Sequence, residues 1–378
     1  MRNGHLLLLL GLVALASCHA DKAKPGMETT KEPRAADSSP PTTRTGPFHL
    51  TGPYTHENLA VFLVHGQERM PDTRCLTLTE ALEHKQVIVH ETSNVNELTV
   101  ENVSGDCDVF IQAGDIVRGG KQDRVLAVDL ILAPKSGKVP IAAFCVEQGR
   151  WSRRGAEHAH AFIISGNALG GSDMKYAVQR AGSQSAVWRD VPEKQRALNR
   201  NLDAEVRSSV SASSFELSLE NDAVKESAKA YTDVLAGIVA EHPDALGYVA
   251  VINGDINIVD IYASRGLFEA LWPKLLKANA VEALTRLSKD TAFEVPDNAE
   301  IEGFLVAAED GTPRAREVSR HVRYVTRDST VGVLFETFDT RHDTGWIHRN
   351  YIAVDESTRP NAAGERRQSP PSESGLYE

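Results

Sequence analysis

Cysteine is scarce in this chain, and positive charge is in deficit. The 378 residues contain four cysteines, and one of them, Cys18, belongs to the leader described below. At most one intramolecular disulfide could then form, which excludes a disulfide scaffold. Lysine and arginine number 41 against 52 aspartates and glutamates, so the formal net charge is −11. A surface this acidic argues against nonspecific binding to nucleic acid or to anionic lipid.

Common catalytic and repeat motifs are missing as well. The chain has no Gly-x-Ser-x-Gly nucleophile elbow and no internal repeat, and beyond the leader it has no apolar run that could cross a membrane. Cys145 lies in an apolar run, where burial raises the pKa of a thiol and makes it inert. We also interpret Cys75 and Cys107 as small buried side chains. The sequence therefore offers no recognisable nucleophile.

The first eighteen residues carry the pattern of a bacterial lipoprotein signal. An apolar run from Leu6 to Ala16 follows Arg2, and small residues precede Cys18, whose sulfur would carry the lipid. The alternative is an ordinary secretory signal that is cut after Ala20. We predict a cell-envelope protein that is held on the membrane by its lipid. His19, rather than aspartate, after the cysteine fits the periplasmic face of the outer membrane in a Gram-negative cell.

Composition divides the chain into four segments. Residues 1–17 are the predicted signal peptide, and residues 18–46 are a proline-rich polar tether with no apolar periodicity. Residues 47–355 are predicted to form a globular domain, and residues 356–378 a polar tail with few apolar side chains.

The predicted fold class is α+β, with an antiparallel β-sandwich or barrel-like first part and a mixed second part of helices and β-hairpins. Short runs rich in Val, Ile and Leu dominate residues 59–146, and we expect hairpin connections at 102–106 and 134–138. In the second part, Asn253-Gly254 between two apolar runs predicts a hairpin. The other predicted elements are helices over 192–206 and 221–241, a helix that starts after Ser264 and is kinked or broken at Pro273, and strands over 331–337 and 346–353.

A charged turn at residues 118–124 is the first candidate site. Gly119 and Gly120 permit left-handed backbone angles that expose successive amide groups to an anion. The surrounding side chains could add charge-assisted hydrogen bonds and fix the orientation of a ligand; they are Arg118, Lys121, Gln122 and Arg124. The alternative is an exposed hairpin whose charges are only solvated, because the turn lacks the strand-to-helix context of a nucleotide-binding fingerprint.

A second charged turn follows at residues 147–151. Glu147 at the end of an apolar run could act as a general acid or base, with Arg150 beside it and Trp151 as a stacking surface. Alternatively, Glu147 and Arg150 form an ion pair across the turn while Trp151 covers the core. The ligand-binding interpretation would be supported if the two turns were adjacent in space.

Histidine clusters give no metal prediction. His158 and His160 would share a face on a strand and could chelate a metal with Glu157, but the sequence shows no further ligand, so we predict neither a metal nor another cofactor. A second polar cluster near the last predicted strands is interpreted as solvated loop residues; its members are Asp339, His342, Asp343 and His348.

At these residues the chain resembles a mainly bacterial family of domains associated with ADP-ribosylglycohydrolases and rhodanese-phosphatases. The resemblance spans most of residues 50–290 and is most specific in Gly-Gly-Lys-Gln-Asp-Arg at 119–124 and Cys-Val-Glu-Gln-Gly-Arg-Trp at 145–151. It implies that both turns form one site and that the family's role is related to ADP-ribose or NAD. Asp115 stands where family members often have glutamate.

Two functions follow as hypotheses. In the first, the tethered domain binds a small anionic ligand, nucleotide-like or similar to ADP-ribose, and in an enzymatic version Glu147 and Arg150 are the catalytic pair of a hydrolysis. In the second, the protein is a non-catalytic envelope lipoprotein that works through protein contacts, and its charged turns pair internally.

Overall fold

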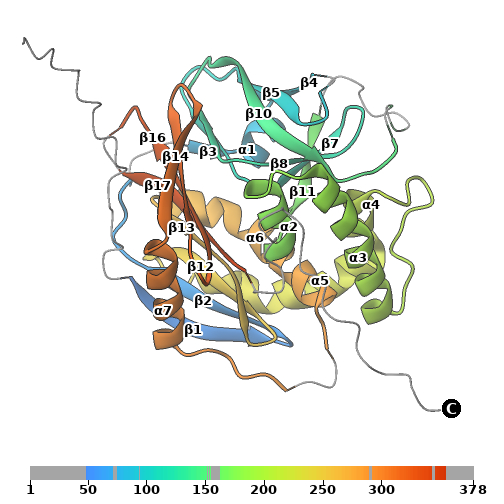
Figure 1. The fold of residues 1–378 in the computed structure, drawn as a ribbon, viewed down its shortest axis with the longest axis vertical. Helices are drawn as coiled ribbons and strands as arrows, with labels where there is room; N and C mark the ends of the chain where they lie inside the picture. Colours follow the sequence, from blue (N-terminus) through green and yellow to red (C-terminus); the bar gives the residue numbers. More distant parts are fainter. Residues whose placement is uncertain are drawn as a thin grey trace, which may run out of the picture. The chain divides into compact units, whose positions relative to one another are not determined.

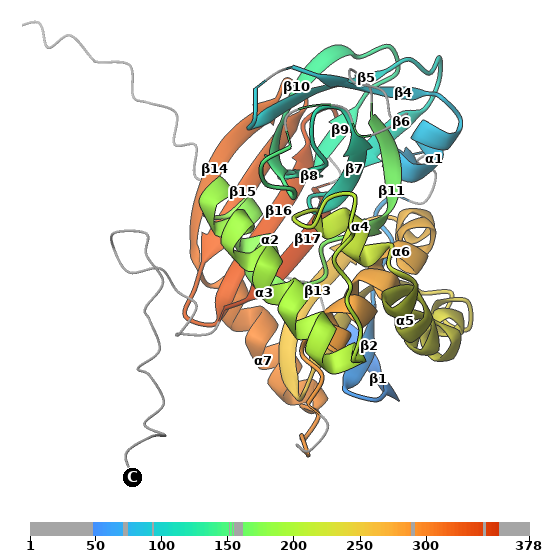
Figure 2. The same cartoon turned by 90° about the vertical axis from the view of Figure 1, so that its right-hand side faces the viewer.

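The computed structural model describes residues 48–70, 75–92, 94–150, 152, 154, 162–288, 292–342 and 345–354. All of these residues lie in the unit Pro40–Glu378. They form antiparallel sheets and helices, which confirms the predicted α+β class (Figures 1 and 2).

The largest sheet has eight antiparallel strands and joins both ends of the described chain. Its second strand, Leu59–His65, pairs with a strand from the second half of the chain and is buried along its whole length. Complete burial means that both faces of this strand are covered, which explains its uninterrupted apolar run. In spatial order the strands are β1 (His49–His56), β2 (Leu59–His65), β12 (Ala245–Ile252), β13 (Asp255–Tyr262), β17 (Trp346–Ala353), β16 (Gly332–Asp339), β15 (Val322–Asp328) and β14 (Thr312–Ser319).

Two smaller sheets come from the middle of the chain and lie at the top of the view in Figure 1. The six-stranded sheet has the order β11 (Phe162–Ala168), β7 (Asp115–Gly119), β8 (Arg124–Leu126), β10 (Gly137–Cys145), β5 (Glu97–Asn102) and β4 (Val87–Glu91). The three-stranded sheet consists of β3 (Cys75–Thr77), β6 (Asp108–Ile111) and β9 (Leu130–Leu132), and its β3–β6 pair is parallel.

The two predicted hairpin connections at 102–106 and 134–138 are wrong. β5 pairs with β4 and β10, whereas β6 and β9 pair with each other, so both turns carry the chain from one sheet to another. Asn102 ties these crossings together, because its buried amide donates to the carbonyl oxygens of Cys107 at 2.8 Å and Leu132 at 3.0 Å. A polar turn sequence predicts a reversal of the chain but not which strand the chain joins next.

The helices pack beside the sheets, and the longest contacts all three of them. Helix α6 touches β12, β11 and β3 (Figure 1). The helices are α1 (Leu78–Glu83), α2 (Ser172–Gln179), α3 (Gln184–Leu202), α4 (Phe215–Leu219), α5 (Asp222–Leu235), the 3₁₀ helix η1 (Ala236–Val239), α6 (Arg265–Thr285) and α7 (Asn298–Glu309).

Local signals placed several of these elements correctly. Ser264 caps α6 by accepting a hydrogen bond from the Leu267 amide, as predicted. Asn253 and Gly254 have φ values of +53° and +86°, which is the tight hairpin turn expected between β12 and β13. Of the two outcomes predicted at Pro273, the break into two helices is wrong, because α6 continues through this residue. The predicted start of a helix at 192 is also wrong, since α3 begins at Gln184.

Candidate functional site

The two charged turns are adjacent. The Gln122 side-chain amide donates to the backbone oxygen of Glu147 at 2.8 Å, and the Val146 amide donates to the backbone oxygen of Asp123 at 3.1 Å. The first turn connects β7 to β8 and the second leaves β10, which pairs with β8. The sheet register therefore brings together two segments that are separated in sequence. Trp151, the predicted stacking surface, lies outside the described residues.

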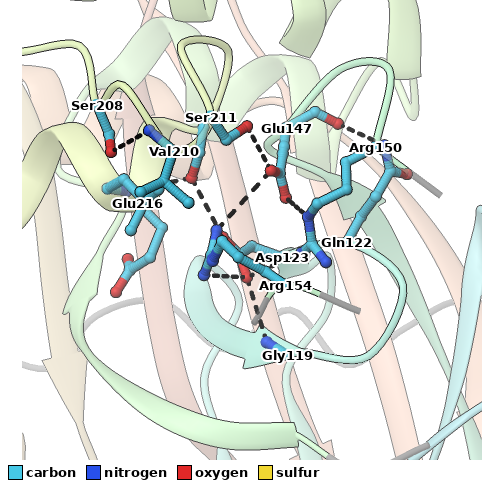
Figure 3. Close-up of polar contacts among 12 residues, drawn as sticks. Gly119, Gln122, Asp123, Glu147, Arg150, Arg154, Ser208, Val210, Ser211 and Glu216 are labelled. Carbon is cyan, nitrogen blue, oxygen red and sulfur yellow. Dashed lines mark hydrogen bonds and ion pairs between the residues drawn. The ribbon is translucent and has the colours of Figure 1, made fainter. Parts of the chain in front are cut away.

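Glu147 is held from two sides. Its side chain has no exposed surface, its Oε2 accepts a hydrogen bond from Arg150 Nε at 2.7 Å, and its Oε1 accepts one from Ser211 Oγ at 2.6 Å (Figure 3). Ser211 belongs to the loop before α4, and this loop lies beside the two charged turns. The Glu147–Arg150 ion pair is one of the two arrangements that the sequence left open.

Asp123 is the second buried carboxylate of the site, and the sequence analysis did not select it. Arg154 donates to both of its oxygens, at 2.9 and 3.3 Å, and Ser214 Oγ donates at 3.2 Å (Figure 3). Arg150 Nη2 lies 3.6 Å from Asp123 Oδ1. We call Asp123, Glu147, Arg150 and Arg154 the turn cluster; its two carboxylates and two guanidinium groups balance in formal charge.

The glycine pair is required by the local geometry. Gly120 has a φ of +54°, and a Cβ there would lie 2.3 Å from Phe162 Cζ. The amides of this turn bind carboxylates of the chain itself, because the Gly119 amide donates to Asp123 at 3.2 Å and the Lys121 amide donates to Glu91 at 3.1 Å. Two amides of this turn are therefore already bound to two different side-chain carboxylates of the chain.

The remaining predicted cations are not equally accessible. Arg124 is fully buried, donates to the backbone oxygen of Gln122 at 3.2 Å and lies 3.8 Å from Glu91 Oε2. Arg118 and Lys121 are half-buried. Of the arginines around the turns, Arg150 and Arg154 retain 12% and 8% exposed side-chain surface, whereas Arg124 retains none.

Glu216 at the start of α4 is a further titratable group that the sequence analysis missed. Burial raises its pKa to about 7, and the charges of Asp123 and Glu220 act in the same direction. Hydrogen bonds from Ser165 Oγ at 2.6 Å and Asn167 Nδ2 at 3.3 Å oppose this shift. A carboxyl group that titrates near neutral pH beside other charges is typical of functional sites. Only the capping residue Ser214 marks this short helix in the sequence.

Two residues of the polar cluster near the last strands, His348 and Asp339, are buried, so their interpretation as solvated loop residues is wrong, whereas His342 is exposed as interpreted. His348 lies on β17, with Nδ1 2.7 Å from Asp129 and Nε2 3.0 Å from Asp260. Lys175 Nζ is 3.7 Å from Asp260. We call Asp129, Asp260, His348 and Lys175 the inter-sheet cluster. Burial lowers the pKa of His348, but the two carboxylates outweigh this effect and raise it to about 9.

The remaining candidates give the following outcomes. The three described cysteines are free; Cys107 and Cys145 are buried as expected, whereas Cys75 is only partly buried. Burial raises the pKa of Cys75 to about 12 and that of Cys145 to about 11, which is typical of inert thiols. Cys18, His158, His160 and Asp343 lie outside the described residues. None of the helices that the structure describes is long and apolar enough to span a membrane.

A cavity of about 320 Å³ lies away from the turn cluster. Its apolar wall includes Val128 and Phe144, and its charged lining consists of Arg180, Arg314, Arg316 and Asp328. Arg180 binds Asp328 through two hydrogen bonds, at 2.6 and 3.0 Å. None of the predicted site residues lines this cavity.

Comparison with known proteins supports one assignment, at the level of family. No curated protein and no solved structure gives a significant match. A family model matches residues 47–352, and this stretch includes both charged turns and all of the described strands but the last residue of β17. The chain belongs to the ARG and rhodanese-phosphatase-superfamily-associated protein domain family.

Proposed function

We propose that the protein is a lipid-anchored envelope protein whose turn cluster binds a small anionic ligand, nucleotide-like or similar to ADP-ribose, and hydrolyses it. The lipoprotein pattern that ends at Cys18 supports the location. The contact between Ser211, Glu147 and Arg150 is the observation that carries the proposed reaction.

These three residues have the geometry of a nucleophile, a base and a group that orients the base. Ser211 Oγ is 2.6 Å from Glu147, within the distance for proton transfer, and Arg150 fixes the other oxygen of the carboxylate. Glu147 takes the proton of an attacking water molecule while the water oxygen bonds to the phosphorus or glycosidic carbon of the ligand and the bond to the leaving group breaks, and the leaving group then takes that proton. If Ser211 attacks instead, its oxygen forms an ester with the ligand, and water releases this ester in the same way. Because Glu147 is fully buried, its carboxylate is shielded from bulk water.

The arginines of the turn cluster provide the contact with an anion. Arg150 and Arg154 are partly exposed, whereas the carboxylates that they bind are not. A phosphate or carboxylate offers a guanidinium group the same paired oxygens as Asp123 does. The ligand therefore binds by sharing these two arginines with the buried carboxylates.

Glu216 is a further buried carboxyl group near the turn cluster, and its side chain is hydrogen-bonded to Ser165 and Asn167. Its pKa of about 7 leaves a large fraction of the carboxyl group protonated under conditions in which Glu147 is ion-paired with Arg150. The two carboxyl groups thus differ in environment, and only Glu147 contacts Ser211 and Arg150.

A ligand panel with matched variants tests this proposal. Thermal shift and turnover are measured with ADP-ribose, nucleotides and sugar phosphates on the mature chain and its variants. We expect Glu147→Gln and Ser211→Ala to bind ligand but to lose about 100-fold or more in turnover, because proton transfer contributes rate and not affinity. Arg154→Ala should weaken binding.

Arg314→Ala is the matched control for Arg154→Ala, because Arg314 is an exposed arginine of the separate cavity. It should leave binding unchanged. If Arg314→Ala abolishes binding while Arg154→Ala does not, the anion site lies in the cavity and the proposal for the turn cluster fails.

The internal pairing of the turn cluster favours a second candidate, a non-catalytic envelope protein that acts through protein contacts. Both carboxylates of the cluster are already bound to arginines of the chain. In this case no ligand of the panel shifts the melting temperature. Arg150→Ala and Arg124→Ala each lower the melting temperature, and for each variant the decrease is the same with and without ligand.

A further inference from the structure

Three side chains of metal-ligating type meet at one end of the eight-stranded sheet, far from the turn cluster in sequence. His49 on β1 is the cross-strand partner of His65 on β2, and His65 is the partner of Ala245 on β12, which follows Asp244 directly. These three strands are neighbours in the sheet, in the lower part of Figure 1. The sheet topology thus brings together two imidazoles and a carboxylate.

The distances within this group suit a single ion. His65 Nδ1 is 2.9 Å from Asp244 Oδ1, and His49 Nε2 is 4.0 Å from Asp244 Oδ2. One ligating atom from each of the three residues lies within 4.8 Å of the other two. Ligand atoms about 2.0 to 2.1 Å from a tetrahedral zinc ion are about 3.3 Å apart, so small side-chain rotations are sufficient.

We propose that His49, His65 and Asp244 bind a divalent transition-metal cation such as Zn²⁺. Imidazole nitrogen and carboxylate oxygen are the ligands that such ions accept. Three protein ligands leave at least one coordination position for water or another small ligand, and the 65% and 59% exposed side chains of His49 and Asp244 keep that position accessible.

The surroundings of His65 orient it for this role. His65 is buried, and its second nitrogen, Nε2, lies 2.8 Å from Thr51 Oγ1. A ligating histidine usually has its other ring nitrogen hydrogen-bonded in this way, which fixes the tautomer and the ring direction. The nearby His242 is not a ligand, because its nitrogens already bind Tyr54 and the backbone oxygen of Ile238.

In a comparable group elsewhere in the fold, a cationic side chain of the protein binds the carboxylates. Asp108, Asp339 and His342 are equally close to one another, but Arg341 donates hydrogen bonds to both carboxylates, at 2.7 and 2.9 Å. Its guanidinium group therefore occupies the position of a cation. In the part of the chain that the structure describes, no lysine or arginine forms an ion pair with Asp244, whose ion-pair partners are the two histidines.

Calorimetric titration of the mature chain, first stripped with a chelator, tests the proposal with ZnCl₂ and then NiCl₂. We expect one ion to bind at this group in each chain. His49→Ala and Asp244→Asn should each weaken that binding about tenfold or more, because even partners of a ligand contribute this much. Both side chains are exposed, so neither variant should unfold the chain, and melting without metal verifies this. His65→Gln is the third variant.

His90→Ala is the matched control, because His90 also faces a carboxylate, Glu101 at 3.2 Å, and no third ligand lies near this pair among the described residues. It should bind metal like the unaltered chain. The proposal is overturned if the unaltered chain binds neither ion, or if His49→Ala and Asp244→Asn bind as tightly as it does. It is also overturned if binding disappears only when His158 and His160 are replaced.

Discussion

The turn cluster and the inter-sheet cluster contain the same charges in different surroundings. Each balances two carboxylates with two basic groups, arginines in the first and His348 with Lys175 in the second. Every side chain of the inter-sheet cluster is at most 2% exposed, whereas the two arginines of the turn cluster are 12% and 8% exposed. The two clusters therefore differ in solvent exposure and not in the number or sign of their charges.

The inter-sheet cluster connects two parts of the fold. Asp129 lies between β8 and β9, whereas Asp260 and His348 lie on β13 and β17 of the large sheet. Removing one partner of such a group leaves buried charges uncompensated. In the turn cluster an arginine can be lost with less cost, because each carboxylate keeps a hydrogen bond from a serine. The two clusters should therefore respond differently to the same kind of substitution.

The largest effect is expected for His348→Ala. Both Asp129 and Asp260 would lose their shared partner, so the free energy of unfolding should fall by about 3 to 5 kcal/mol. Urea denaturation at neutral pH measures it. A loss below about 1 kcal/mol is the size expected for a surface ion pair. It would contradict the expectation that the inter-sheet cluster contributes more to stability than the turn cluster.

A pH titration of stability should separate the two regions. The pKa of His348 is raised from 6.5 to about 9, so its contribution is complete below pH 6.5 and is lost as the pH rises through 9. The pKa of Glu216, next to the turn cluster, is raised from 4.5 to about 7, so stability falls between those values as its proton is lost. Each step amounts to about 3 kcal/mol.

Glu216→Gln isolates the lower of these windows. It should flatten the change between pH 4.5 and 7 and leave the change between pH 6.5 and 9, as followed by urea denaturation at each pH. An unaltered slope in the lower window would show that Glu216 has an ordinary pKa in the folded chain.

A smaller loss is expected for Arg154→Ala in the turn cluster. Asp123 keeps its hydrogen bonds from Ser214 and Gly119, with Arg150 3.6 Å away, so we expect about 1 to 3 kcal/mol in the same urea assay. Combining it with Asp123→Asn should recover part of this loss, because the buried charge is then removed as well. A loss equal to that of His348→Ala would contradict the distinction between the clusters.

The smallest effect provides the baseline. Lys229 and Asp233 form an exposed pair on α5, with side chains 68% and 59% exposed. Lys229→Ala should change the free energy of unfolding by about 0.3 to 0.5 kcal/mol. A change above about 1 kcal/mol would mean that exposure does not set the order of these effects.

Local features of the fold were predictable from the sequence, and long-range ones were not. The Asn253-Gly254 turn and the Ser264 cap depend on residues within a few positions, and both were predicted correctly. The pairing of β2 with β12 was not predicted, because apolar periodicity shows that a strand is buried but not which strand it joins. For the same reason, two sheet crossings were mistaken for hairpins.

The candidate site shows the same limit. The motif residues Gln122 and Glu147 lie together as the resemblance implied, but Ser211 and Glu216 come from a segment without a recognisable motif. The side chain of His348 was interpreted as solvated, although it falls in a predicted strand, because polar residues usually indicate solvent. Only the tertiary structure shows that two distant carboxylates compensate its burial.

The strand order of the large sheet also fixes an order of assembly. His65 pairs with Ala245, about 180 positions later, so β2 can complete its pairing only after about two-thirds of the chain is present, and contacts so distant in sequence form slowly. The six-stranded sheet, by contrast, comes entirely from residues 87–168. During synthesis, the middle of the chain can fold first, while the β1–β2 hairpin remains a two-stranded ribbon with an open edge that other chains can join.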